Sequence, residues 1–289
     1  MSTQPGSVTS RRAAMDRGLL CLMLVACKPA VHEDPHPAVA PTPDVPVASS
    51  RAAPHSGAGD SMSELPSGIH TQTFLVGDTT VRYTILVPEG YSRTAPAPLI
   101  VMLHYGGYNG DVPPFYGRGM IEGLAQPAFR SLRAIIIAPD SIVGDWTTAE
   151  NDAAVVSLTR AIMSHYAVDP AKVVLSGYSM GGVGTWHIGN KHQDLFAAAI
   201  PIASAPAGDA AWTIPLYVIH SRDDEVLPIA PVRDHVNKLK AAGARIEWRE
   251  LADLTHYNTG AFAPALADAA GWLERSWRSA EHRRRDGGP

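Results

Sequence analysis

The residues best suited to chemistry form the segment Gly177-Tyr178-Ser179-Met180-Gly181, which has the pattern G-x-S-x-G. An apolar run, residues 172–176, precedes it, and residues 182–191, which can form a helix, follow it. This context predicts a sharp strand-to-helix turn that exposes the serine hydroxyl to a base and to a substrate. Glycines two residues before and after the serine avoid collisions with the neighbouring strand and helix. The pattern predicts Ser179 as a nucleophile, with a chance match as the alternative.

A serine nucleophile needs a general base, and the base needs an acid that orients it. Residues 216–219 form an apolar run that leads into His220-Ser221-Arg222-Asp223-Asp224-Glu225. Residues 245–251, in which apolar and polar residues alternate, predict a last strand, followed shortly by His256. Catalytic groups of α/β proteins follow the carboxyl ends of strands, so this order of serine, acid and histidine predicts a triad. Taken alone, the acids favour a solvated loop and His256 a surface histidine.

A loop of small residues predicts the site that stabilises an oxyanion. The apolar run at residues 99–103 leads into His104-Tyr105-Gly106-Gly107. We expect the backbone N–H of Met180 to donate to the oxyanion together with an N–H of this loop, with Gly106 preferred to Tyr105. The alternative is a plain glycine turn.

Strand and helix signals alternate along most of the chain. Residues 71–76 and 80–87, joined by Gly77-Asp78, predict an antiparallel hairpin. Unbroken apolar runs predict buried parallel strands at residues 99–103, 134–138, 173–175, 197–202 and 216–219. Helical spacing of apolar residues predicts helices near residues 150–166, 232–239 and 262–277, the first opened by the capping box Thr147-x-x-Glu150. We expect an α/β fold with a mostly parallel sheet, helices on both faces and no large cap domain.

The first residues of the chain predict export. Three arginines precede a short apolar run, residues 18–26, which has the length of a signal peptide and is too short to span a bilayer. The run ends in Leu24-Val25-Ala26-Cys27, which resembles the bacterial lipoprotein cleavage box. We expect residues 1–26 to be a signal and Cys27 to be lipidated, which would hold the protein in the cell envelope on the periplasmic or outer-surface side. The alternative is an ordinary secretory signal.

The composition of the residues after the signal predicts a tether, a catalytic domain and a tail. Residues 27–66 are rich in proline and alanine and predict a disordered tether. Residues 67–279 are predicted to form the catalytic domain, and residues 280–289 a disordered basic tail. The net charge of −4 and the lack of a basic stripe argue against nucleic acid as a partner. Asp223-Asp224-Glu225 lacks calcium-loop spacing and no His-rich zinc spacing accompanies it, so we expect neither metal nor organic cofactor.

Taken together, these motifs resemble the α/β-hydrolase serine esterases. The likeness rests on the loop after residue 103, on Asp169-Pro170-x-Lys172-Val173 before the G-x-S-x-G segment, and on residues 220–228. It extends over about residues 80–277 and points to the phospholipase/carboxylesterase and feruloyl-esterase or polyhydroxybutyrate-depolymerase-like families. The resemblance implies that Asp224, four residues after the first histidine of its segment, is the acid. The chain departs from these families where Tyr105, Ser221 and Thr255 stand in place of glycines.

The resemblance also implies a reaction. Ser179 attacks an ester carbonyl, His256 takes its proton, and an acyl-enzyme forms that water then hydrolyses. We expect an open cleft that takes short-chain, aromatic (feruloyl-like) or polyester substrates, with Tyr108, Trp146 and Tyr178 as substrate-binding residues. Two alternatives remain open, a prolyl-oligopeptidase-like peptidase and a non-catalytic surface binding protein on the same fold.

Overall fold

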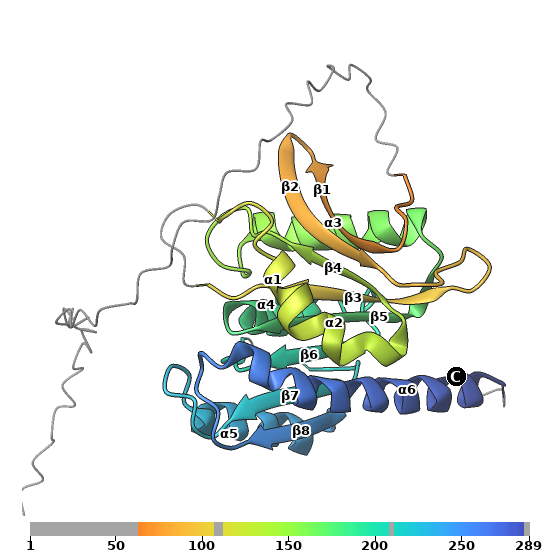
Figure 1. Ribbon diagram of the computed structural model, residues 1–289. Helices are drawn as coiled ribbons and strands as arrows, with labels where there is room; N and C mark the ends of the chain where they lie inside the picture. The colour runs from red at the N-terminus through yellow and green to blue at the C-terminus, as the bar shows by residue number, and fades with distance from the viewer. Residues whose placement is uncertain (1–62, 107–111, 208–210, 286–289) are drawn as a thin grey trace, which may run out of the picture. The chain divides into compact units, whose positions relative to one another are not determined.

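The computed structural model describes residues 63–106, 112–207 and 211–285, without the side chains of residues 283 and 284. An eight-stranded sheet, in the order β1-β2-β4-β3-β5-β6-β7-β8, organises this part of the chain, and its strands are labelled in Figure 1. Cys27, Gly107 and Tyr108, with the predicted signal and nearly all of the predicted tether, lie outside the described residues.

The sheet is antiparallel at one edge and parallel elsewhere. β1 (Gly68–Val76) and β2 (Thr79–Val87) form the predicted hairpin, and β2 also runs antiparallel to β4 (Ile135–Pro139). All other neighbours pair in parallel. These remaining strands are β3 (Ala97–Leu103), β5 (Val168–Tyr178), β6 (Ala198–Ile202), β7 (Leu216–Ser221) and β8 (Ile246–Leu251). Carboxyl ends of parallel strands share one edge, so the loops after β3, β5 and β7 can meet there.

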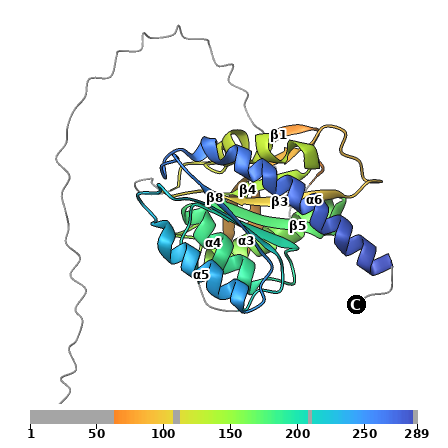
Figure 2. The same ribbon diagram turned by 90° about the horizontal axis from the view of Figure 1, so that it is seen from below.

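Helices cover both faces of the sheet, as Figure 2 shows. One face carries α3 (Ala149–His165), α4 (Met180–Lys191) and α5 (Ile229–Ala241). The other carries α6 (Ala263–Arg285), the 3-10 turn Thr259–Phe262 that directly precedes it, and four further short helical turns. These turns are α1 (Arg118–Met120), a π turn (Ile121–Ala125), α2 (Gln126–Phe129) and a 3-10 turn (Arg130–Leu132).

Burial on both faces explains the unbroken apolar runs in the sequence. Along β3, Leu99, Val101 and Leu103 belong to the hydrophobic cluster under α3, α4 and α5. The alternate residues, Ile100 and Met102, belong to the cluster under α6. Successive side chains of a strand point to opposite faces, so a strand covered twice must be apolar throughout. The prediction of a mostly parallel sheet with helices on both faces is confirmed.

Two local predictions need correction. The N-cap of α3 is Thr148, whose hydroxyl accepts the N–H of Asn151 at 3.3 Å. Thr147 is not the N-cap because α3 begins one residue later than the capping box requires, at Ala149, and the Thr147 hydroxyl instead donates to Asp145 at 2.5 Å. The tail predicted to be disordered from residue 280 is helical through residue 285, and Lys172 ties this part of α6 to the domain through an ion pair with Glu281 at 3.0 Å.

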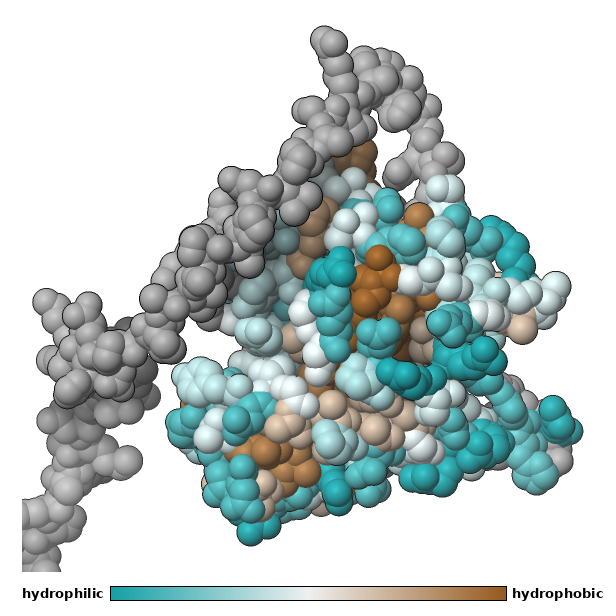
Figure 3. All heavy atoms as spheres, viewed as in Figure 1, coloured by the Kyte–Doolittle hydropathy of each residue, from teal (hydrophilic) through white to brown (hydrophobic). Residues whose placement is uncertain are grey.

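The face of the domain seen in Figure 3 is largely hydrophilic, with separate hydrophobic patches. The large hydrophobic residues most exposed among those described are Leu75, Tyr105, Val143, Val226 and Tyr257. Three of them, Tyr105, Val226 and Tyr257, line one pocket, which is described below. No helix in the described part of the chain is long and apolar enough to span a bilayer.

Candidate active site

Ser179 occupies a strained turn between β5 and α4. Its backbone has φ 55° and ψ −116°, a conformation that a residue with a side chain rarely adopts. Two backbone hydrogen bonds hold it there: the N–H of Ser179 donates to the carbonyl of Ile202 at 3.0 Å, and its own carbonyl accepts the N–H of Val183 at 3.0 Å. The strand–turn–helix arrangement predicted for the G-x-S-x-G segment is therefore present.

The two glycines of the segment are required by close packing. A Cβ atom on Gly177 would lie 2.2 Å from the carbonyl oxygen of Gly181. A Cβ atom on Gly181 would lie 2.2 Å from the carbonyl oxygen of Leu103, at the end of β3. Both distances are far below van der Waals contact, so any other residue at either position would force the turn apart.

The three residues of the predicted triad meet at the carboxyl edge of the sheet. His256 Nε2 lies 2.7 Å from Ser179 Oγ, and His256 Nδ1 lies 2.8 Å from Asp224 Oδ2. The side chain of Asp224 is 0% exposed and that of His256 is 8% exposed. The second carboxylate oxygen of Asp224 accepts the N–H groups of Val226 at 3.0 Å and Leu227 at 2.7 Å. These bonds fix the plane of the carboxylate toward the imidazole.

The two acids beside Asp224 also bind the loop that carries His256. Asp223 Oδ2 accepts the backbone N–H of Asp253 at 2.6 Å. Glu225 Oε2 accepts the backbone N–H of His256 itself at 2.9 Å. The sequence predicts these two acids to be solvated, and its only signal for these contacts is the run of three carboxylates on one loop.

Tyr178, predicted to bind substrate, lines the pocket near the triad, but its hydroxyl is hydrogen-bonded to another residue of the protein. The hydroxyl donates to the carbonyl oxygen of His256 at 2.7 Å. The ring packs edge-on against Phe262, with centroids 5.2 Å apart. Burial raises the pKa of the Tyr178 phenol, so the hydroxyl keeps its proton across the physiological pH range.

The loop after β3 is held by a buried histidine. The N–H of Ser141 donates to His104 Nε2 at 3.0 Å, which makes Nε2 an acceptor and leaves the ring proton on Nδ1. Nδ1–H then donates to the carbonyl of Tyr105 at 2.8 Å. Burial lowers the pKa of His104, in keeping with a neutral ring. A bond of the same kind lies at the end of β7, where His220 Nδ1 is 3.0 Å from the carbonyl oxygen of Ser221.

Trp146 does not line the pocket as predicted. Its side chain is buried, and its indole N–H donates to the carbonyl of His104 at 2.9 Å. Gly184 of α4 packs directly on it, since a Cβ atom there would lie 2.3 Å from the Trp146 Cβ. Trp146 therefore stabilises the loop after β3 from the buried interior of the domain.

A pocket of about 420 Å³ opens beside the triad. Its walls include Ser179, His256, Gly106 and Met180, and a Cβ atom on Gly106 would lie 3.3 Å from Met180 Sδ. Aromatic and apolar side chains form the rest, from Tyr105, Tyr178, Val226 and Tyr257, with Thr259 beside them. The 13 residues 203–215, of which 208–210 lie outside the described residues, separate β6 from β7 and are too few to form a cap domain there.

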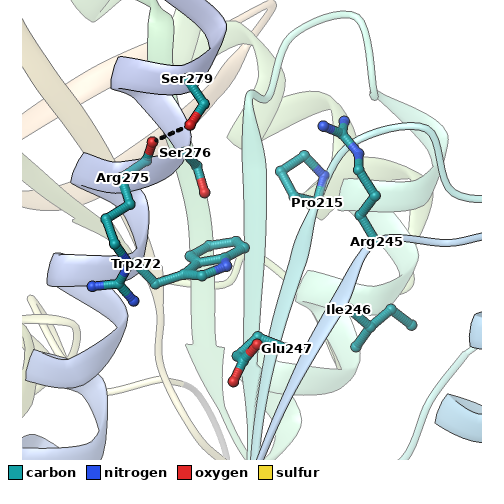
Figure 4. Close-up of a pocket in the computed structure, with 8 residues that line it drawn as sticks. All are labelled: Pro215, Arg245, Ile246, Glu247, Trp272, Arg275, Ser276 and Ser279. Atoms are coloured by element: carbon teal, nitrogen blue, oxygen red, sulfur yellow. Dashed lines mark hydrogen bonds between the residues drawn. The ribbon is translucent and has the colours of Figure 1, made fainter.

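A second pocket, of about 360 Å³, lies at the amino ends of β7 and β8 (Figure 4). The indole of Trp272 extends from α6 toward the strands, while Pro215 and Arg245 lie across from it. Arg245 donates to the carbonyl of Thr213 at 2.9 Å. The triad follows the carboxyl ends of strands, so this pocket lies at the opposite end of the sheet and is separate from the candidate active site.

The parts of the chain that the structure describes contain no group of three or more His, Cys, Asp or Glu side chains that could bind a metal ion. Asp223, Asp224 and Glu225 each accept backbone or imidazole N–H groups instead.

Comparison with known proteins links the chain to hydrolases. The model of the prolyl oligopeptidase family matches residues 141–210, which include Ser179. Feruloyl esterase C of Emericella nidulans is 28% identical over 159 residues, covering 51% of this chain and 56% of that protein. Feruloyl esterase D of Neurospora crassa is 26% identical over 196 residues, covering 62% and 64%. The chain thus spans less than two thirds of the length of the curated relatives it matches.

Solved structures extend this likeness to the fold. A thermostable esterase is 25% identical with a TM-score of 0.61, over 72% of this chain and 62% of that chain. Esterase 2 of Thermogutta terrifontis, phosphoramylated by tabun, has a TM-score of 0.56 at 17% identity, over 72% of this chain and 94% of that one. The chain has the α/β-hydrolase fold and resembles esterases in both sequence and structure.

Proposed function

We propose that the protein is a serine hydrolase that cleaves carboxylic esters. The observation that carries this proposal is the unbroken hydrogen-bond chain from Ser179 through His256 to Asp224, with the serine on a strained turn. A nucleophile, a base and an orienting acid in mutual contact are what acyl transfer through a serine requires. The names of the feruloyl esterase relatives give independent support for an ester as substrate.

The reaction follows from the proton positions. Asp224 accepts Nδ1–H of His256, which leaves Nε2 free to take the Ser179 proton during attack on the ester carbonyl. The C–O bond of the ester breaks as the imidazolium returns this proton to the leaving alcohol. Water, deprotonated by the same Nε2, then releases the acid from the acyl-enzyme and restores the serine.

The backbone N–H groups of Met180 and Gly106 are proposed to stabilise the oxyanion. Met180 is the first residue of α4, where its N–H has no helical carbonyl to bind. His104 pulls the carbonyl of Tyr105 toward itself. Because a trans peptide directs its N–H opposite to its C=O, the N–H of Gly106 faces away from His104. This geometry favours Gly106 over Tyr105, and each such donor is typically worth about 3 kcal/mol in the transition state.

The substrates are proposed to carry an aromatic group, as in feruloyl esters. Three tyrosines line the pocket: Tyr105, Tyr178 and Tyr257. The side chains at the mouth are partly open to solvent, since Tyr105 is 36% and Tyr257 77% exposed. An edge-to-face or offset contact with an aromatic ring is worth about 0.5–1.5 kcal/mol beyond the area it buries. Short-chain and polyester substrates would use the same open pocket with fewer of these contacts.

A substrate panel tests this proposal. The purified enzyme is assayed with p-nitrophenyl acetate, methyl ferulate, an aliphatic polyester and peptide p-nitroanilides, with Ser179→Ala as the control. We expect turnover of the esters, a higher kcat/KM for methyl ferulate than for an aliphatic methyl ester, and little cleavage of the amides. Preferential cleavage of the amides would favour the second candidate, a peptidase, for which the prolyl oligopeptidase family match at residues 141–210 is the supporting observation.

We also propose that a lipid on Cys27 anchors the protein in a bacterial cell envelope. The support is the sequence alone, because Cys27 lies outside the described residues. A proline-rich stretch between Cys27 and β1 suits a catalytic domain held at a distance from the membrane. Secretion without an anchor is the alternative.

A further inference from the structure

We propose that Tyr178 and Glu225 are positioning residues that clamp the main chain of His256 from opposite sides. The inference rests on the proposed function, because it concerns the placement of the catalytic base. It differs from the triad itself, since neither residue touches the reacting atoms. Glu225 binds the backbone N–H of His256 at 2.9 Å, and the Tyr178 hydroxyl binds its carbonyl at 2.7 Å.

The clamp completes the hydrogen bonding of His256. Its two ring nitrogens are bonded to Ser179 and Asp224, and its two backbone groups to Glu225 and Tyr178. The acceptors and donors come from two segments only, the strand end at residues 178–179 and the loop at residues 224–225. The imidazole is therefore fixed by its backbone as well as by its partners in the proposed reaction.

The loop that carries His256 needs such support. Its other residues from Ala252 to Asn258 are exposed or half-buried, and only His256 is buried. Asp253 adopts a positive φ of 61°, and the glycine expected by family resemblance before the histidine is Thr255. Loops of this kind move more than the strands they follow. A displacement of about 1 Å in a catalytic group can cost about 100-fold in rate.

Tyr178 provides the rigid side of the clamp. It is the last residue of β5 and directly precedes Ser179, so the nucleophile and the anchor of the base share one strand end. Its ring is fully buried and packs against Phe262. Burial keeps the phenol protonated by raising its pKa, and the hydroxyl can then always donate to the His256 carbonyl. The distance between base and nucleophile is thereby tied to a single rigid element.

Glu225 provides the other side through its position next to Asp224. The two acids are adjacent, so one loop binds the imidazole and the backbone of the same histidine. Asp223 extends the contact by binding the N–H of Asp253. The role assigned to Glu225 is that of a hydrogen-bond acceptor, which an amide oxygen can also fill. Its charge is largely screened because the side chain is exposed.

The test measures kcat per active site, titrated with a fluorophosphonate, for Tyr178→Phe, Glu225→Ala and Glu225→Gln. We expect a loss of about 10- to 100-fold in kcat for Tyr178→Phe and Glu225→Ala, with KM changed less than about threefold. Glu225→Gln is expected to stay within about threefold of wild type, because its amide oxygen can accept the same N–H.

Two matched controls separate positioning from stability. Tyr91→Phe removes another hydroxyl that makes two bonds, to Glu64 and to the N–H of Ala167, but remote from the site. Glu247→Ala removes an exposed acid on β8. Both are expected to keep wild-type kcat per titrated site, and Tyr91→Phe to lower the melting temperature.

The rate of Ser179 labelling by the fluorophosphonate gives a readout that needs no ester substrate, and we expect it to fall in step with kcat. Wild-type kcat and labelling in both Tyr178→Phe and Glu225→Ala would overturn the clamp, even in an active esterase. A loss in Glu225→Gln as large as in Glu225→Ala would overturn the hydrogen-bond role and assign the effect to charge. A wild-type protein that is labelled but hydrolyses no ester would instead contradict the proposed function, while the labelling rates still decide the clamp.

Discussion

Replacement of Asp224 by asparagine tests the role of the acid with the least change in shape. One oxygen of the Asp224 carboxylate accepts two backbone N–H groups, from Val226 at 3.0 Å and Leu227 at 2.7 Å. In the variant these donors require the amide oxygen, which turns the amide NH₂ toward His256. His256 Nδ1 must then accept instead of donate, so its proton moves to Nε2, which can no longer take the Ser179 proton.

We therefore expect Asp224→Asn to lose about 10⁴-fold in kcat, as the same change does in a well-studied serine protease, which corresponds to about 5 kcal/mol in the barrier. The assay is kcat on one ester at pH 7, with Asp223→Asn as the matched control. Asparagine at position 223 keeps an oxygen for the N–H of Asp253, so its loss should stay below about tenfold. A larger loss in Asp223→Asn than in Asp224→Asn would refute this reasoning and shift the acid by one residue.

Three further predictions concern the turn, the buried histidines and the anchor. Gly181→Ala should lower the free energy of unfolding by about 3 kcal/mol, because the added Cβ would lie 2.2 Å from a carbonyl oxygen of β3. Gly119→Ala should be neutral, because a Cβ there has no atom within 4 Å. Denaturant titration of both variants tests this difference. Burial lowers the pKa of His104 and His220 below 6.5, so at acidic pH the unfolded chain binds protons that the folded chain does not. The free energy of unfolding should therefore fall as the pH drops below about 6.5, by up to about 1.4 kcal/mol per pH unit for each histidine. Equal stability at pH 7.0 and 5.5 would contradict this. Cys27→Ser should release the protein from the membrane fraction of a bacterial host, and unchanged fractionation would contradict lipidation.

Much of the fold could be predicted from the sequence because the central strands of the sheet are buried on both faces. The unbroken apolar runs of β3, β4 and β5 indicated strands covered on both faces, and the turn at Gly77-Asp78 indicated the hairpin. The segment around Ser179 could also be recognised, because its glycines are required by packing that any such turn shares. These features depend on residues that are close together in the sequence, so they can be recognised from the sequence alone.

The supporting contacts could not be predicted because they join distant residues. Nothing near Tyr178 indicates that its hydroxyl reaches the backbone of a residue 78 positions later. The sequence predicts Trp146 at the pocket, yet its indole N–H donates to the buried carbonyl of His104. Thr147 and Thr148 are equally good caps by type, and only the residue at which α3 begins distinguishes them. Such choices depend on which partners the tertiary structure brings within reach.

The central claim, that Ser179 is a nucleophile activated by His256, is tested most directly by covalent labelling. The wild-type protein and Ser179→Ala are treated with a fluorophosphonate, and the intact mass and the labelled peptide are determined by mass spectrometry. The account predicts one adduct on wild type, located on Ser179, and none on Ser179→Ala under the same conditions. An adduct on another residue, equal labelling of the variant, or no labelling of folded wild type would contradict it.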